Sequence, residues 1–184
     1  ETFVLECYKG KKFPQDAKRK PRLHGAKASS RGISNEQIAI CVGIQRDGKA
    51  IAATVNRAKP SKEELSLMFA DHLNESTLIL TDGLRSYSTF DGFKDCSVVD
   101  ATRTNGSFFN LNTVNGMHSF IKETYNHYRG VATKYINRYN ALFSLVYRCA
   151  DGLASELFAR VCDISTYMFK HTIQEVRTRE LTIL

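Results

Sequence analysis

The apolar run at 77–81 (TLILT) ends at an acid, Asp82, which Gly83 follows. A short, continuous apolar run bounded by a turn is typical of a strand that is covered on both faces, as in α/β proteins. Ligand sites in open α/β sheets lie outside the carboxyl ends of such strands. Asp82 is therefore a candidate functional residue, although an Asp-Gly pair is also typical of a plain turn.

Patterns on either side of this run predict a mixed sheet flanked by helices. Strands are expected at 2–8, 37–45, 50–55 and 96–100, with a hairpin turn at 46–49 (RDGK). Pro60-Ser61 opens a helix that is expected to reach His72, and further helices are expected at 111–128, 135–149 and 154–171. This order is that of an α/β, ribonuclease-H-like fold with extra C-terminal helices. The expected domain is 1–145, with a basic insertion at 9–33, and 146–184 is expected to form a helical extension packed on it.

Composition agrees with one globular domain, since the chain has 184 residues and 42% of them are hydrophobic. No apolar run approaches the roughly eighteen residues of a membrane span, and the first residues lack the pattern of a secretory signal. We therefore expect a cytoplasmic protein that does not contact membranes. The five cysteines are scattered without zinc-ligand spacing, which predicts reduced and mostly buried thiols.

Positive charge is concentrated between Lys9 and Arg31. This stretch has a net charge of +8, whereas the whole chain has a net charge of +7. The other 161 residues therefore have a net charge of about −1. Such a segment indicates either a polyanionic partner or a solvated, disordered loop, and charge alone does not separate the two. The candidate contacts are Lys11, Lys12, Lys18, Arg19, Lys20, Arg22, Lys27 and Arg31.

The expected helix at 111–128 separates into two faces at 100° per residue. The face expected to turn toward the core holds Val114, Met117, Phe120, Ile121 and Tyr128. The opposite stripe holds Asn115, His118, Ser119 and Lys122. The helix is thus predicted to present an amide, an imidazole and an ammonium group together.

Five segments, taken in order, resemble one family. They are 1–11 (ETFVLECYKGK), the 19–22 (RKPR) and 31–34 (RGIS) patch, 81–83 (TDG), 114–122 (VNGMHSFIK) and 130–135 (GVATKY). Together they are similar to bacterial insertion-sequence transposases that carry a zinc ribbon and a helix-turn-helix ahead of a D-D-N-K or D-D-E-K catalytic domain. The resemblance spans roughly residues 1 to 145, and each motif alone is weakly specific.

The resemblance implies a metal-dependent polynucleotidyl transferase that acts on transposon ends and target DNA with Mg²⁺ or Mn²⁺, as a homo-oligomer. Asp82 matches the second metal-binding aspartate, Asn115 the third ligand position, and Lys122 the lysine that contacts the DNA end. The first aspartate of the family would directly precede Glu1, so the chain as given is expected to be inactive. Asn110 occupies a position where some members carry a histidine.

Simpler interpretations remain open at this stage. Asn115 could cap a helix, Lys122 could be a solvated surface lysine, and His118 could be a structural residue as readily as a DNA contact. An Asn ligand brings no charge and accepts no proton, so metal would bind more weakly than with Glu. The alternative function is a non-catalytic, ribonuclease-H-like nucleic-acid-binding module or a degenerate transposase remnant.

Overall fold

The computed structural model describes residues 1–17, 20–21, 27–103 and 108–148, together with Gly152, Ser155 and Ala159. The expected helix at 154–171 and most of the extension at 146–184 lie outside the described residues. The same holds for Lys18, Arg19 and Arg22.

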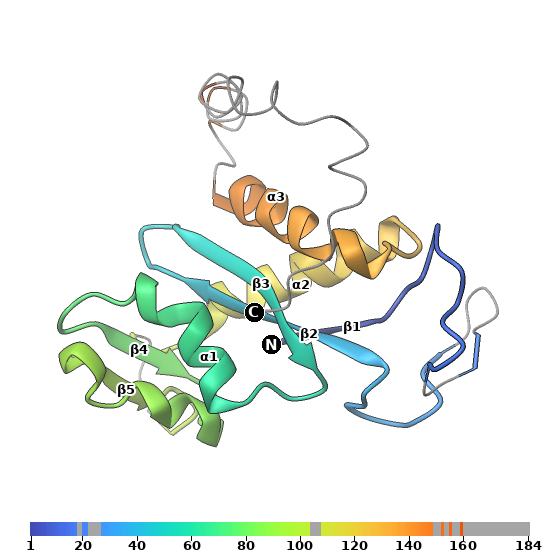
Figure 1. The fold of residues 1–184 in the computed structure, drawn as a ribbon. Coiled ribbons are helices and arrows are strands. Elements are labelled where there is room, and N and C mark those ends of the chain that lie inside the picture. Colours follow the sequence, from blue (N-terminus) through green and yellow to red (C-terminus); the bar gives the residue numbers. More distant parts are fainter. Residues whose placement is uncertain are drawn as a thin grey trace.

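Three antiparallel strands form the larger sheet (Figure 1): β1 (Thr2–Leu5), β2 (Gln37–Ile44) and β3 (Ala50–Arg57), with β2 in the centre. The predicted hairpin joins β2 to β3, and Gly48 adopts the positive φ of 92° that its turn requires. The pairing shifts register between Ala39 and Ile40, which marks a β-bulge in β2.

Two parallel strands, β4 (Leu78–Thr81) and β5 (Ser97–Asp100), form a second sheet. The single mixed sheet expected from the sequence is thus divided into two sheets that share no ladder of backbone hydrogen bonds in the described residues. The expectation that β4 is covered on both faces is wrong at its start, because the side chain of Leu78 is 46% exposed. Among the described residues, β5 is the only strand that pairs with β4.

Helix α1 (Lys62–Phe69) begins as its sequence predicts. Ser61 and Glu64 form a capping box, and Glu63 and Glu64 lie in the first turn, where the helix dipole favours acids. A short 3-10 helix, η1 (Ala70–His72), extends it. The helix covers one face of the larger sheet through a core of Cys41, Val55, Leu65, Met68 and Phe90.

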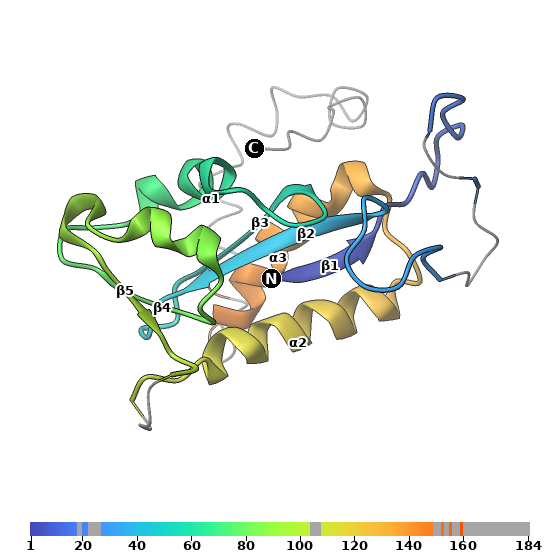
Figure 2. The same ribbon diagram turned by 90° about the horizontal axis from the view of Figure 1, so that it is seen from below.

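Helices α2 (Asn112–His127) and α3 (Ile136–Arg148) cover the opposite face, so the sheet lies between helical layers (Figure 2). This second core contains Ile40, Met117, Ile121, Tyr125, Ile136 and Phe143. The two cores follow strand alternation, because Ile40 points toward α2 and its neighbour Cys41 points toward α1. The α/β class is therefore confirmed.

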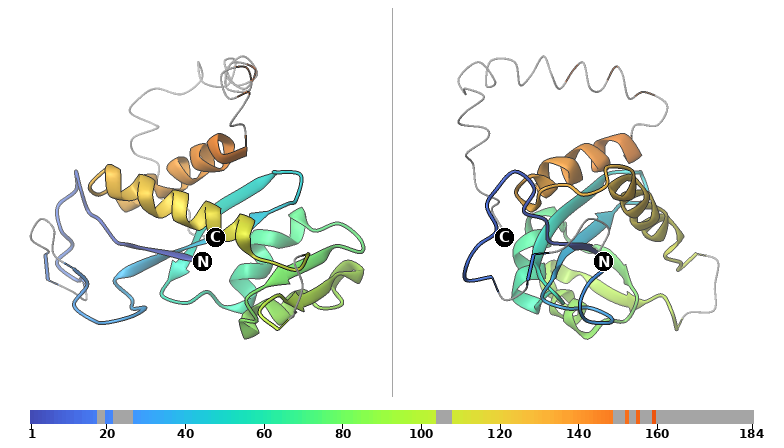
Figure 3. Two further views of the ribbon diagram at one scale, coloured as in Figure 1. Left: turned by 180° about the vertical axis from the view of Figure 1, so that it is seen from behind. Right: turned by 90° about the vertical axis from the view of Figure 1, so that its right-hand side faces the viewer.

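The remaining described elements are short 3-10 helices: η2 (Arg85–Phe90) and η3 (Phe93–Asp95) lie between β4 and β5, and η4 (Thr133–Tyr135) lies between α2 and α3. Figure 3 shows β4 and β5 beside α1, beyond one end of the larger sheet, while the segment after β1 extends from the other end. None of the helices among the described residues has the length and apolar character needed to cross a membrane.

Candidate functional site

Asp82 directly follows β4, as the sequence predicts, and its side chain is exposed. Its Oδ1 accepts a hydrogen bond from the Leu84 amide at 3.2 Å, and the hydroxyl of Thr81 accepts one from the Gly83 amide at 3.2 Å. Gly83 has a φ of 78°. These contacts fix a tight turn that holds the carboxylate of Asp82 at the end of the strand.

Asp100 ends the neighbouring strand and lies against the same turn. Its backbone pairs with Thr81, and a Cβ built on Gly83 would overlap its carboxylate. This close approach explains the glycine after Asp82. The carboxylate of Asp100 also accepts a hydrogen bond from the Thr102 hydroxyl, which lowers the pKa of Asp100, and pairs with Arg103 Nε at 2.9 Å.

A second acid, Glu1, lies close enough to Asp82 to interact with it electrostatically. Burial raises the pKa of Glu1, and the negative charge of Asp82 raises it further against the opposing effect of the amino terminus. The hydroxyl of Tyr87, from η2, donates to Glu1 Oε1 at 3.5 Å, and the pKa of Tyr87 is raised by burial and by the charge of Glu1. The carboxyl groups of Glu1, at the start of β1, and of Asp82, at the end of β4, are therefore near enough to interact.

Helix α2 presents Asn115 and Lys122 on an exposed stripe, as predicted. Asn115 is the fourth residue of the helix, whose N-cap is Leu111, so the capping interpretation of Asn115 is wrong. In the described part of the chain, Lys122 has no hydrogen-bond or ion-pair partner. Asn110 helps to shape the turn before the helix, since its Oδ1 accepts from the Asn112 amide at 3.1 Å.

His118 does not share this exposed stripe. Its side chain is buried against β1, where Nδ1 lies 2.7 Å from the Thr2 hydroxyl and Nε2 lies 3.0 Å from the amino group of Glu1. The expectation of an exposed imidazole is therefore wrong, because α2 turns toward the sheet at this position. The expectation for Tyr128 is wrong in the opposite sense. Its side chain was expected to face the core, but it is 44% exposed.

Glu6 lies at the other end of β1 and takes no part in this acidic group. Its buried carboxylate pairs with Arg57 on β3 at 2.6 Å. Strand alternation alone does not decide which side of β1 Glu6 faces. The ion pair assigns it a structural role.

The basic segment is exposed at each described candidate cation, namely Lys11, Lys12, Lys20, Lys27 and Arg31. It projects from the end of the larger sheet that lies away from β4 and β5 (Figures 1 and 2). The cations and the acids around Asp82 therefore occupy opposite ends of the molecule. Sequence patterns do not indicate this separation, because it depends on where the β1–β2 connection leaves the sheet.

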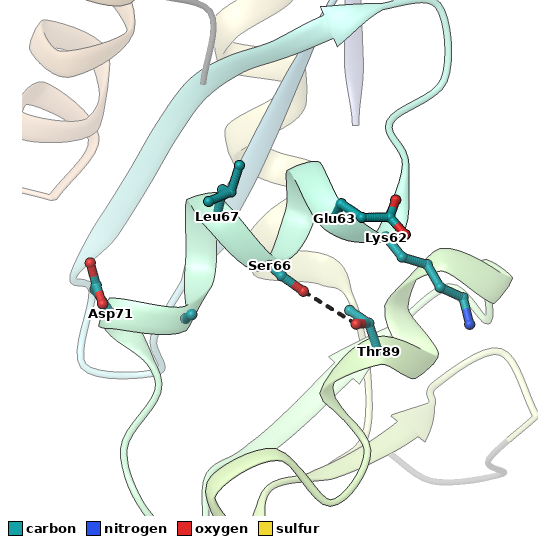
Figure 4. A pocket seen from close by; sticks show the side chains of 7 residues that line it. Lys62, Glu63, Ser66, Leu67, Asp71 and Thr89 are labelled. Carbon is teal, nitrogen blue, oxygen red and sulfur yellow. Dashed lines mark hydrogen bonds between the residues drawn. The ribbon is translucent and has the colours of Figure 1, made fainter.

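No group of three His, Cys, Asp or Glu side chains that could hold a metal ion occurs in the described part of the chain. The carboxylates gathered around the ends of β4 and β5 are those of Asp82, Glu1 and Asp100, of which Asp100 is paired with Arg103. Asn115 offers an amide oxygen on α2. A groove of about 620 Å³ lies elsewhere, between α1 and η2 (Figure 4). It is lined by Lys62, Glu63, Asp71 and the hydrogen-bonded pair Ser66 and Thr89. None of the candidate site residues predicted from the sequence lines this groove.

Comparison of the chain with models of known protein families, with curated proteins and with solved structures finds no match.

Proposed function

We propose that this chain is the catalytic domain of a metal-dependent DNA transposase with a ribonuclease-H-like fold. The observation that carries the proposal is the placement of Asp82, an exposed carboxylate at the carboxyl end of β4 next to a second acid, Glu1. An exposed acid at a strand end is where an α/β sheet holds a ligand. The resemblance of the sequence to insertion-sequence transposases adds the reaction class.

The donor chemistry at this place fits Mg²⁺ or Mn²⁺, which prefer carboxylate and carbonyl oxygens. Burial is the main cause of the raised pKa of Glu1 and the charge of Asp82 adds to it, so the two carboxylates repel one another and a cation between them would relieve that repulsion. Asp82 and the amide oxygen of Asn115 would hold the metal. The metal would supply charge neutralisation at the scissile phosphate.

The resemblance adds one further acid, an aspartate directly before Glu1. Side chains alternate along a strand, so a residue in that position would share the face of Thr2. Thr2 contacts His118 on α2, one helical turn from Asn115. An aspartate there would face the same helix that carries the third ligand position.

The charges suggest how DNA would lie. The exposed cations after β1 and the exposed Lys122 on α2 both attract phosphates, and Lys122 is two turns along the helix from Asn115. A duplex that follows α2 would therefore contact the basic segment at one end of the domain and reach Asp82 at the other. Lys122 would act as a point charge on a phosphate near the scissile bond.

The experiment uses the chain extended by an aspartate before Glu1, with Mn²⁺ or Mg²⁺ and supercoiled plasmid DNA. Nicking or strand transfer that Asp82→Ala abolishes and Asp91→Ala preserves is the expected result. Asp91 is an exposed acid outside the acidic group and serves as the matched control. Equal activity of the extended chain and its Asp82→Ala variant would overturn the proposal. Metal-independent DNA binding without any cleavage would favour the non-catalytic module instead.

A further inference from the structure

Phe108 is the most exposed large apolar side chain among the described residues, at 75%. It belongs to the loop between β5 and α2, and its ring meets that of Phe109 edge to face at a centroid distance of 5.3 Å. Exposure of a phenyl ring to water is unfavourable, so a ligand that covers the ring would bind more tightly.

The loop is held in place by a cation from another element. Arg46, in the β2–β3 turn, donates to the carbonyl oxygens of Phe108 at 3.2 Å and Asn110 at 3.0 Å, and to the Thr113 hydroxyl at 3.4 Å. Arg46 is exposed, and no carboxylate pairs with it in the described part of the chain. Its guanidinium group therefore orders the backbone beneath the phenyl ring and leaves positive charge beside it.

A second cation lies at the start of the same loop. Arg103 is 85% exposed and pairs with Asp100 through Nε, while its terminal guanidinium nitrogens contact no other described residue. The described parts of this connection thus carry an exposed ring at Phe108 and a cation at Arg103, and the Arg46 guanidinium group is bound to the backbone beside the ring. Nucleic acids bind such combinations, because phosphates attract the cations and bases stack on the ring.

The two described ends of this connection lie beside candidate site residues. At one end, Asp100 lies against the turn of Asp82 and Gly83. At the other end, Arg46 joins the Phe108 carbonyl to the Thr113 hydroxyl in the first turn of α2, the helix that carries Asn115. DNA bound at Asn115 would therefore lie near Phe108.

From these observations we infer that Phe108 stacks on an unpaired base at the end of the DNA that the site holds, with Arg46 and Arg103 facing the adjacent phosphates. This inference rests on the proposed DNA-processing function and adds to it a recognition surface for a frayed or single-stranded terminus. An unpaired base has an accessible face, whereas a base inside a duplex would first have to leave its stack.

The test measures binding of the full chain to two DNAs at one salt concentration, a short blunt duplex and the same duplex with a single-stranded 3′ overhang that contains 2-aminopurine. Phe108→Ala should weaken binding of the overhang DNA by about fivefold or more and restore 2-aminopurine fluorescence, because the base no longer stacks on an aromatic side chain. Binding of the blunt duplex should change by less than about twofold. Phe108→Trp should retain the affinity for the overhang.

Phe93→Ala is the matched control, since Phe93 is also an exposed phenylalanine, 38% accessible, with the cation of Lys94 at 5.4 Å from its ring centroid. It should leave both affinities unchanged. If the parent chain binds both DNAs but Phe108→Ala behaves like Phe93→Ala, or weakens both DNAs equally, the inference is overturned while the proposed function stands. If the parent chain binds neither DNA, the proposed function fails, and the inference fails with it.

Discussion

The Thr2 hydroxyl and His118 Nδ1 lie 2.7 Å apart in the interior, although 116 positions separate them in the sequence. This hydrogen bond fixes the first turns of α2 against the start of β1. It therefore sets the distance between the acids near Glu1 and the exposed face of α2.

Removal of the His118 side chain should destabilise the fold. His118→Ala leaves the buried Thr2 hydroxyl without its partner, which costs about 1–3 kcal/mol of unfolding free energy. The double variant Thr2→Val/His118→Leu replaces both polar groups with apolar ones and should recover most of this loss. Urea denaturation measures both, with His127→Ala on the exposed end of α2 as the control. If His118→Ala leaves the stability unchanged but weakens DNA binding, His118 instead belongs to the protein surface that contacts DNA.

The same histidine should make stability depend on pH. Burial, then the amino terminus and Lys122, lowers the pKa of His118 from its usual 6.5 to about 3. The unfolded chain therefore takes up the proton first, so this contribution to stability is complete above pH 6.5 and decreases as the pH falls toward 3. The loss should be on the order of 1 kcal/mol per pH unit within that window. His118→Gln should flatten this part of the profile, and an unaltered slope in that variant would contradict the assignment.

A larger side chain at position 116 should be disfavoured by a close contact with α3. A Cβ at this position would lie 2.7 Å from the hydroxyl oxygen of Tyr147, whose hydroxyl donates to the Thr113 carbonyl at 3.4 Å. Alanine is normally preferred over glycine inside a helix by about 0.5–1 kcal/mol. We expect Gly116→Ala to show less than this gain, or a loss, in the parent chain and the full gain in a Tyr147→Phe background. A double-mutant cycle by thermal unfolding measures the coupling, and additive effects would exclude the contact.

Local patterns predicted most of the elements, because each depends on neighbours in the sequence. The helix that begins after Ser61 and the hairpin at Gly48 are examples. The burial of His118 was missed, since a helical wheel gives angles but not which neighbour covers them, and β1 lies over this edge of α2. The pairing of Glu6 with Arg57 and the approach of Glu1 to Asp82 depend equally on the tertiary arrangement. The exposure of Asp82, Asn115 and Lys122 followed correctly from strand ends and helical spacing.

Asp82 should control both metal affinity and the protonation of Glu1. Asp82→Asn removes a negative charge beside Glu1, so the pKa of Glu1 should fall, although burial, the main cause of its shift, remains. In the chain extended by an aspartate, the same variant should weaken Mn²⁺ binding by at least about tenfold. NMR titration of the Glu1 carboxyl and calorimetric titration with Mn²⁺ measure the two effects. Asp91→Asn should alter neither quantity. If Asp82→Asn leaves the pKa of Glu1 unchanged, the two acids do not interact.

The basic segment should determine how DNA affinity responds to salt. Removing one cation that neutralises a phosphate should reduce the slope of log K against log salt by about 0.9, so Lys11→Ala/Lys12→Ala should flatten it by up to about 2. Lys49→Ala/Lys62→Ala removes the same charge from exposed positions outside the segment and should leave the slope nearly unchanged. Fluorescence anisotropy with a duplex at several salt concentrations measures the slopes. Equal slopes for the two double variants would show that positive charge in general, rather than the segment after β1, attracts DNA. The proposed course of the duplex along α2 would then have no support from the basic segment.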